Sequence, residues 1–225
     1  MRPIDVRPRN PGDPVPDTLG LRLAHRVMLA DAARLAALVE DIAAGQTRCD
    51  RPRARAIAAY LVSFCDSVHH HHTVEDAVLR PVVEASAGSR IDFTGLTDDH
   101  AELDPRLDQL RVAAAAFAAE PDEDTATTLA VGLAELRDLL SEHIADEEAA
   151  LLPIIEAYVS VANWDGVERQ IRERADLAFE VPRIVAVTTP EELAALKADG
   201  GLVIRLLLAV LGPRFRKRER AVFGP

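Results

Sequence analysis

The side chains best suited to chemistry in this sequence of 225 residues are its seven histidines. They occur at four places in the chain: His25, the run His69 to His72, His100 and His143. Neutral imidazole is a frequent metal ligand, whereas a histidine buried by itself is more often a core residue held by hydrogen bonds. The four places therefore favour a metal site only if the fold brings them together.

Two carboxylates accompany the histidines at helical spacing. Glu75 follows His71 by four residues and Glu147 follows His143 by four, so each pair lies on one face of a helix. Apolar neighbours place both faces inside the protein, where polar groups need partners. Four imidazoles and two carboxylates satisfy one another only in part by hydrogen bonds and exceed the ligands of one tetrahedral ion. This set is consistent with a pair of metal ions bridged by carboxylates.

The elements that must position these residues are helices. Ala, Leu, Arg and Glu dominate, and aromatic residues make up only 4%, which is typical of an all-α protein rather than a β-sandwich or barrel. Apolar residues recur every three or four positions in four segments, which predict helices over residues 17–44, 50–86, 97–119 and 122–160. Short breaks between them predict an up-and-down antiparallel four-helix bundle, with a kink at Pro81.

The height of the histidines along such a bundle follows by counting from the turns. His25 and His71 lie about 23 residues on either side of a turn near residue 48, and His100 and His143 lie about 21 residues on either side of the break near residue 121. Each pair is therefore expected at one level of the bundle. Consecutive residues turn by about 100°, so we expect His69 and His70 at the surface or supporting a ligand by a hydrogen bond.

Both ends of the chain are expected to be appendages. Residues 1–16 hold five of the fourteen prolines and predict a flexible N-terminal arm, and residues 161–225 predict a C-terminal helical extension. We expect Trp164 to fix this extension to the bundle; if it does not cover its own bundle, it should form a homodimer contact. Its expected elements are a helix over 163–180, a helix that stops at Gly200, the apolar run 202–212 and a solvated charged tail at 214–220.

Charge and cysteine content narrow the classes of function. The net charge of −11 and the isoelectric point near 5.1 argue against binding to nucleic acid. Cys49 and Cys65 fit neither a disulfide scaffold nor a CxxC motif. The N-terminus lacks the apolar segment of a signal peptide, and the run 202–212 is too short to span a bilayer. The sequence therefore predicts a cytoplasmic protein without a transmembrane segment.

Taken together, these residues resemble a known family. The series consists of His25, HHTVED at 71–76 followed by LRP, DDHAELD at 98–104 and SEHIADEEAALLP at 141–153. It is similar to bacterial-type hemerythrin-like domains, also called HHE cation-binding domains, over about residues 17–160. The resemblance implies a non-haem centre of two iron ions with an oxo or hydroxo bridge, with zinc as the alternative metal. The implied ligands are His25, His71, Glu75, His100, His143 and Glu147, with Glu75 and Glu147 as the bridging carboxylates.

The pattern departs from that of the oxygen-carrying members of the family. Those members have a second histidine on the third helix, where this chain has Asp104, and their last carboxylate follows its histidine by five residues rather than four. We therefore do not expect reversible storage of dioxygen. Two candidates for a further ligand remain, His72 and Asp104.

Three functions follow as expectations. The first is redox chemistry of a di-iron centre with hydrogen peroxide or nitric oxide. The second is a module that binds or senses dioxygen, nitric oxide or iron without turnover and acts on a partner through residues 161–225. The third is a redox-silent structural site, such as a zinc site. The expected partner is a small-molecule oxidant or a diatomic gas.

Overall fold

The computed structural model describes residues 4–224, apart from the side chains of residues 94–99, 199–200 and 202–205. Within these residues the only β contact is an isolated bridge between Pro8 and Val159, and every other regular element is a helix. The prediction of an all-α protein is confirmed.

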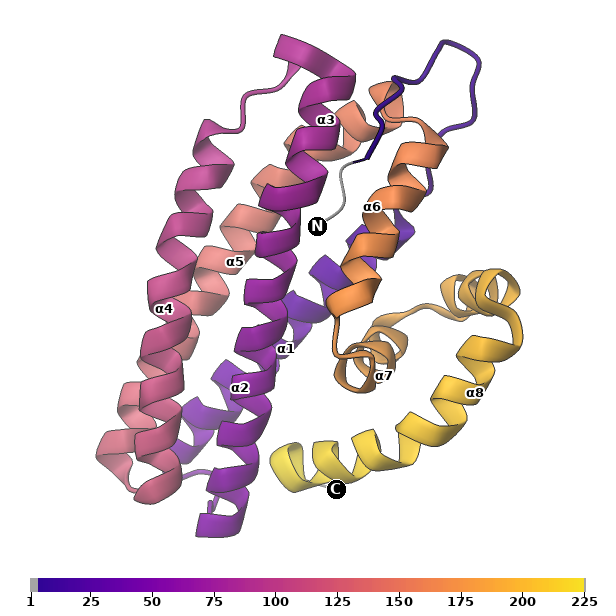
Figure 1. Ribbon diagram of the computed structural model, residues 1–225. Helices are drawn as coiled ribbons and strands as arrows, with labels where there is room; N and C mark the ends of the chain where they lie inside the picture. Colours follow the sequence, from indigo (N-terminus) through magenta and orange to yellow (C-terminus); the bar gives the residue numbers. More distant parts are fainter. Residues whose placement is uncertain (1–3, 225) are drawn as a thin grey trace.

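Four long helices form the body of the protein: α1 (Leu19–Ala43), α2 (Arg51–Val74), α4 (Thr94–Ala119) and α5 (Glu123–Tyr158). Figure 1 shows them side by side: α1 packs along α5, α5 along α4, and α4 along α2. The contact between α1 and α2 is much smaller.

Two of these helices begin at side-chain caps. Asp50 accepts a hydrogen bond from the N–H of Arg53 at the start of α2, where Pro52 occupies the first turn. Asp122 caps α5 and exchanges hydrogen bonds with Thr125, which also satisfies the N–H of Asp122. Each cap satisfies backbone donors that have no partner within the helix.

Three short elements connect α2 to α4: a π-helix at Glu75–Leu79, α3 (Arg80–Ala87) and a 3₁₀ turn at Gly88–Arg90. In the π-helix the N–H of Arg80 bonds to the carbonyl of Glu75, five residues earlier. Pro81 follows in the first turn of α3, where its missing N–H is tolerated. Instead of a kink at Pro81, the helix thus has a wider π-helical turn that begins earlier, at Glu75. Such turns inside helices are frequent at functional sites.

Two apolar clusters fill the bundle, one above the other. On α2, Val68 belongs to the larger cluster and Val74 to the smaller one; on α5, Ile144 belongs to the larger cluster and Leu151 to the smaller. The candidate metal ligands of both helices fall at this change from one cluster to the other. They therefore form a polar layer between two apolar regions, where an unpaired polar group is costly.

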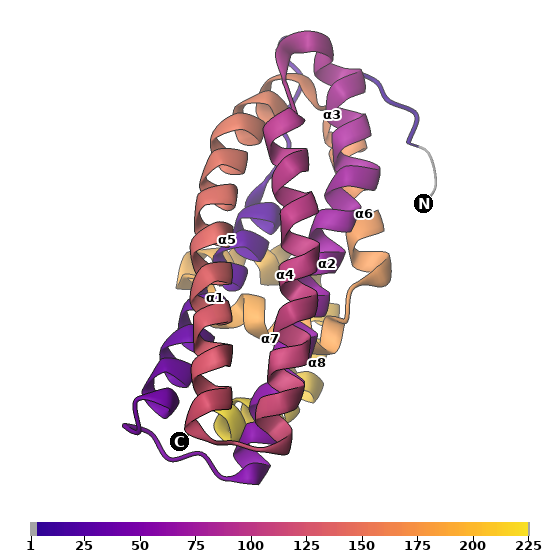
Figure 2. The ribbon, with the colours of Figure 1, turned by 90° about the vertical axis from the view of Figure 1, so that its left-hand side faces the viewer.

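The chain after α5 forms three helices: α6 (Val161–Arg174), α7 (Leu177–Val187) and α8 (Pro190–Phe223). Trp164 of α6 is buried and donates a hydrogen bond of 2.7 Å to the carbonyl of Asp17. α7 packs on α1 and α8 packs on α2, behind the bundle in the view of Figure 2. The extension thus covers the side on which α1 and α2 contact each other little.

The prediction of one helix over residues 163–180 is wrong in its extent. The chain forms two helices here, α6 and α7, with a break between them. Asp176 causes this break, because its side chain accepts hydrogen bonds from the N–H groups of Ala178 and Phe179 and so begins a new helix.

The predicted helix end at Gly200 lies one residue from a break in α8, whereas the charged stretch 214–220 is a helix rather than a free solvated tail. α8 kinks at Gly201, whose φ of 54° suits glycine, and then continues to Phe223. Arg218 donates hydrogen bonds of 2.7 Å to the carbonyl of Ala59 and to the hydroxyl of Ser63. The charged stretch is therefore a helix that packs on α2, a long-range contact that local charge density does not reveal.

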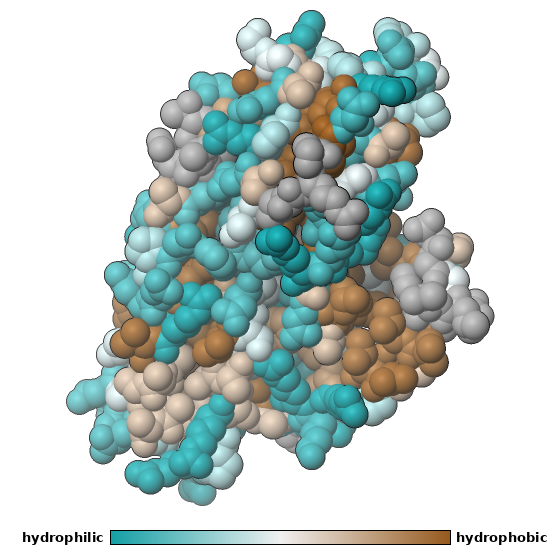
Figure 3. Space-filling view, in the orientation of Figure 1, coloured by the Kyte–Doolittle hydropathy of each residue, from teal (hydrophilic) through white to brown (hydrophobic). Residues whose placement is uncertain are grey.

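Apolar side chains remain exposed on α8. Leu206 is 64% exposed and Val210 is 53% exposed. Figure 3 shows hydrophobic side chains gathered at the right of the molecule, where α8 lies in Figure 1. No helix in the described part of the chain is both long and apolar enough to cross a membrane.

The segment before α1 contacts the bundle at several points. The N–H of Arg9 donates a 2.8 Å hydrogen bond to the carbonyl of Tyr158, and the amide of Asn163 donates one of 3.1 Å to the carbonyl of Arg7. The mobility expected of residues 1–16 stays a prediction.

Candidate metal centre

Seven candidate ligands from four helical segments meet in the polar layer of the bundle. Five are fully buried, and the side chains of His71 and His100 are 9% and 10% exposed. The segments that supply them are α1 (His25), α2 with the following π turn (His71, His72 and Glu75), α4 (His100) and α5 (His143 and Glu147).

The ligands form two groups. One group consists of His72, His100 and His143; the other consists of His25, His71, Glu75 and Glu147. Within each group the nitrogen or oxygen atoms that would bind a metal all lie within 4.8 Å of one another. The fold therefore brings together all six residues that the resemblance implied, and it adds His72.

The two carboxylates lie between the groups. Glu75 Oε1 is 2.8 Å from Nε2 of His71, and Glu75 Oε2 is 3.9 Å from Nε2 of His100. Glu147 Oε2 is 3.3 Å from Nε2 of His25 and 3.9 Å from Nε2 of His143. Each carboxylate thus reaches one histidine of each group, as a carboxylate that bridges two metal ions must do.

Several buried polar atoms of this layer have no hydrogen bond. They are Nε2 of His72, both side-chain oxygens of Glu75 and Oε2 of Glu147. Glu75 Oε1 and His71 Nε2 approach to 2.8 Å but without the geometry of a hydrogen bond. Buried polar atoms in proteins are almost always satisfied. A pair of cations between the groups would satisfy all four atoms, so the residues present fit the metal centre that the family implies.

Two further carboxylates hold ligand imidazoles from the outside. Nδ1 of His25 lies 2.9 Å from Oε1 of Glu148, and Nδ1 of His100 lies 3.1 Å from Oδ2 of Asp76. A carboxylate that accepts a hydrogen bond from Nδ1 leaves Nε2 as the free lone pair that faces the metal. These supporting residues strengthen the site and fix the orientation of two rings.

Asp76 and Glu148 were not among the predicted site residues, although the sequence contains a signal for both. Each one directly follows a candidate bridging carboxylate, Glu75 or Glu147. Because consecutive helical residues turn by about 100°, the second acid of each pair leaves the inner face and meets the histidine of a neighbouring helix.

The charges in the layer favour a bound cation. Burial opposes protonation of His25, but Glu147, Glu148 and Glu75 outweigh it and raise the pKa of His25 well above its ordinary value. Burial and the charge of Glu75 together raise the pKa of Glu147. The carboxylates thus draw positive charge into the layer and repel one another without it.

His72 has the opposite tendency. Burial lowers the pKa of His72 well below its ordinary value, more than the charge of Glu75 raises it. His72 is therefore neutral at physiological pH, and neutral imidazole is the form that binds metal ions.

The remaining predicted residues lie outside both groups. Asp104 accepts a hydrogen bond of 2.7 Å from Nδ1 of His69, and both side chains are more than half exposed. Nε2 of His70 lies 3.1 Å from the carbonyl of Ile171 on α6. Of the two candidates for a further ligand, the fold therefore brings His72 to the centre and leaves Asp104 at the surface.

A helical bundle with a buried layer of imidazoles and carboxylates defines a class of protein that binds metal cations. A sequence model of the hemerythrin HHE cation-binding domain matches residues 20–155. The chain belongs to this family, as the sequence analysis predicted. The matched residues include all seven candidate ligands and exclude the C-terminal extension. No curated protein and no solved structure matches this chain.

Proposed function

We propose that this protein is a non-haem di-iron protein that reacts with hydrogen peroxide or nitric oxide. The observation that carries the proposal is the position of Glu75 and Glu147, buried, without hydrogen bonds at the atoms named above, and between two groups of histidines. Carboxylates in this position are able to bridge a pair of metal ions.

The residues divide naturally between two ions. His25 and His71 would hold one ion, and His72, His100 and His143 would hold the other, with Glu75 and Glu147 shared. The unequal number of imidazoles leaves the first ion with fewer protein ligands. An ion with an open position is where a small substrate binds.

Two bound ferrous ions would supply the two electrons that, with two protons, reduce hydrogen peroxide to two waters, and the protein supplies position. Glu148 and Asp76 keep Nε2 of His25 and His100 directed inward. The apolar clusters above and below the layer exclude water, which strengthens electrostatic interactions within it.

We assign the proposed metal centre to a helical bundle domain over residues 17–160. We infer an up-and-down antiparallel topology from the packing of α1 on α5, α5 on α4, and α4 on α2.

We place the protein in the cytoplasm because both cysteines are free thiols, which suits a reducing compartment. The extension covers part of the bundle, and we propose a homodimer contact only for the stretch of α8 where Leu206 and Val210 stay exposed; light scattering would measure the oligomeric state.

A sensing function without turnover is the alternative, and one contact favours it. Arg26, next to His25 on α1, forms hydrogen bonds of 2.7 and 3.0 Å with Glu192 of α8. A shift of His25 on binding a gas would therefore reach the extension. Zinc in place of iron would exclude both functions.

Three measurements test the proposal. Elemental analysis of protein purified in air should give about two iron ions per chain, and its absorption spectrum should show ligand-to-iron charge-transfer bands. The reduced protein mixed with hydrogen peroxide or nitric oxide in stopped flow should oxidise rapidly, and His100→Ala should abolish turnover. Zinc alone, or a stable dioxygen complex that reverses on degassing, would overturn the proposal.

A further inference from the structure

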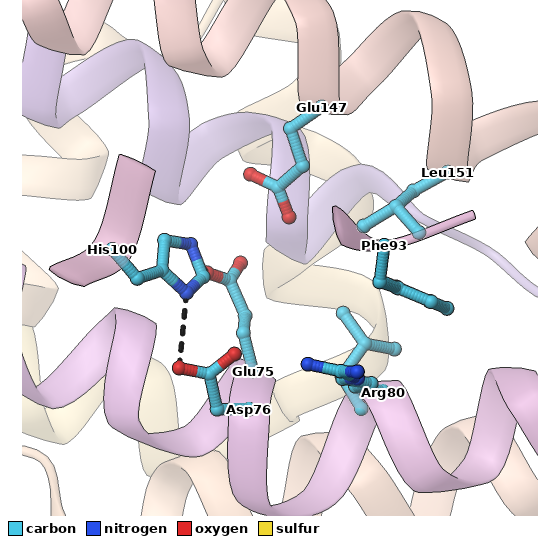
Figure 4. Close-up of a pocket in the computed structure, with 8 residues that line it drawn as sticks. Glu75, Asp76, Arg80, Phe93, His100, Glu147 and Leu151 are labelled. Carbon is cyan, nitrogen blue, oxygen red and sulfur yellow. Dashed lines mark hydrogen bonds and ion pairs between the residues drawn. The ribbon is translucent and has the colours of Figure 1, made fainter. Parts of the chain in front are cut away.

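A small pocket adjoins the candidate metal centre. Figure 4 shows Glu75, Glu147 and His100 on its inner side, which is the side where the two carboxylates reach both groups of histidines. The pocket therefore ends at the atoms that would hold the metal ions.

The walls of the pocket are apolar, and its outer edge is polar. Leu79, Phe93 and Leu151 line it and are 1%, 7% and 3% exposed. Arg80 and Asp76 also line it, with side chains 35% and 43% exposed. The metal ligands and the apolar walls are all at most 10% exposed, and only the charged edge is open to solvent, so we take this edge as the mouth of an entry route.

The free space in the pocket is about 10 Å³. This volume corresponds to about one water molecule. A molecule of two heavy atoms needs only small movements of the side chains to pass, whereas an alkyl group must displace Leu151 or the ring of Phe93. Apolar walls of this kind hold back larger substrates by steric exclusion.

Phe93 is held in its place at the wall. The guanidinium of Arg80 lies over its ring, 5.4 Å from the centroid, and Nε of Arg80 donates a 2.9 Å hydrogen bond to Glu84. A ring that is fixed from outside discriminates by size better than a mobile one.

We propose that oxidants reach the metal centre through this pocket, and that Leu151 and Phe93 admit hydrogen peroxide and diatomic gases but exclude alkyl hydroperoxides. The inference rests on the proposed function, because it requires a metal beyond Glu75 and Glu147. It adds that the substrates of that site are limited by their size.

The test compares Leu151→Ala with Leu152→Ala in the full-length, iron-loaded protein. Leu152 is the next residue of α5, belongs to the same apolar cluster and is 6% exposed, but it does not line the pocket. The two variants lose the same atoms, so a difference between them reports on the pocket rather than on packing. Iron content is measured in each sample.

Two readouts are taken. The first is the rate at which azide, a small anion, binds to the oxidised protein, followed by absorbance and independent of turnover. The second is the ratio of oxidation rates of the reduced protein by tert-butyl hydroperoxide and by hydrogen peroxide. Leu151→Ala should speed azide binding and raise the ratio by at least about tenfold, whereas Leu152→Ala should leave both at the wild-type values.

Phe93→Leu provides a second variant, because it opens the same wall at a residue nearer the surface. It should raise the ratio in the same direction if Leu151→Ala does not fold. Unchanged ratios in every folded pocket variant with full iron content overturn the entry route alone. A wild-type protein that retains no iron overturns the proposed function, and the entry route with it.

Discussion

Glu148 accepts a hydrogen bond of 2.9 Å from Nδ1 of His25, across the interface between α5 and α1. The side chain of His25 is 1% exposed and that of Glu148 is 34% exposed, so a carboxylate near the surface orients an imidazole in the core. Nε2 of His25 consequently faces His71 at 3.1 Å and Glu147 at 3.3 Å. Glu148 thus directs a candidate ligand without belonging to either group of candidate ligands.

Glu148→Gln should weaken metal binding by about 10- to 100-fold while the helical content stays the same, because the amide is a poorer acceptor for the Nδ1 proton. Competition with a chelator measures the affinity. Glu142→Gln is the matched control, since it makes the same change at an exposed position of α5. Equal affinities in the two variants would show that Glu148 does not support His25.

His72 and Asp104 should behave differently when they are replaced. His72→Ala should reduce iron content and alter the absorption spectrum, because Nε2 of His72 is buried beside His100 and His143 and has no hydrogen-bond partner. Asp104→Ala should change neither, because Asp104 pairs with His69 at the surface. The opposite result would assign the further ligand to Asp104.

Removal of the metal should lower the melting temperature. A metal that binds only the folded state and is present at 100 times its dissociation constant adds about 2.7 kcal/mol to stability. The apoprotein also leaves Glu75 and Glu147 buried and close together. Calorimetry of protein before and after chelation, with elemental analysis of both samples, measures the effect; equal melting temperatures would contradict a coupled metal site.

The extension should contribute strongly to stability through one buried ion pair. Nε of Arg183 on α7 donates a 2.6 Å hydrogen bond to Asp31 of α1, and both side chains are at most 2% exposed. Arg183→Met should cost about 1 to 3 kcal/mol, because buried Asp31 loses this partner but keeps Arg34 at 3.3 Å and the hydroxyl of Tyr60 at 2.9 Å. Urea unfolding measures the loss.

Two controls accompany this prediction. The double replacement of Arg183→Met with Asp31→Asn should recover part of the loss, since no buried charge is then left over. Asp138→Asn removes an exposed ion pair with Arg137 and should have no measurable effect. A loss in Arg183→Met no larger than that in Asp138→Asn would refute a role of the pair in holding the extension.

Stability should fall as the pH rises above about 9, and Cys65 should account for part of the fall. Burial raises the pKa of the Cys65 thiol from 9.0 to about 12 in the folded protein. Between these values the unfolded chain loses the proton and the folded chain keeps it, so each pH unit favours unfolding by about 1.4 kcal/mol. Cys65→Ala should show a shallower slope in urea unfolding between pH 9 and 11; an unchanged slope would exclude the thiol as the cause.

The sequence by itself determined the features that depend on neighbours within one or two helical turns. The cap at Asp50 and the pairing of His71 with Glu75 follow from helix geometry, because positions three or four apart share a face in every α-helix. Counting from the turns also placed His25 and His71 at one level, since the rise per residue is constant.

Only the tertiary structure decided which face of one helix meets which side chain of another. The rotation of α4 brings His100 to Asp76 and turns Asp104 toward His69, and the docking of α7 places Arg183 on Asp31. These contacts join residues far apart in the chain, and their energies depend on burial and packing that no local pattern records. For the same reason, the sequence of the charged end of α8 predicts a solvated tail, whereas in the fold this segment packs on α2.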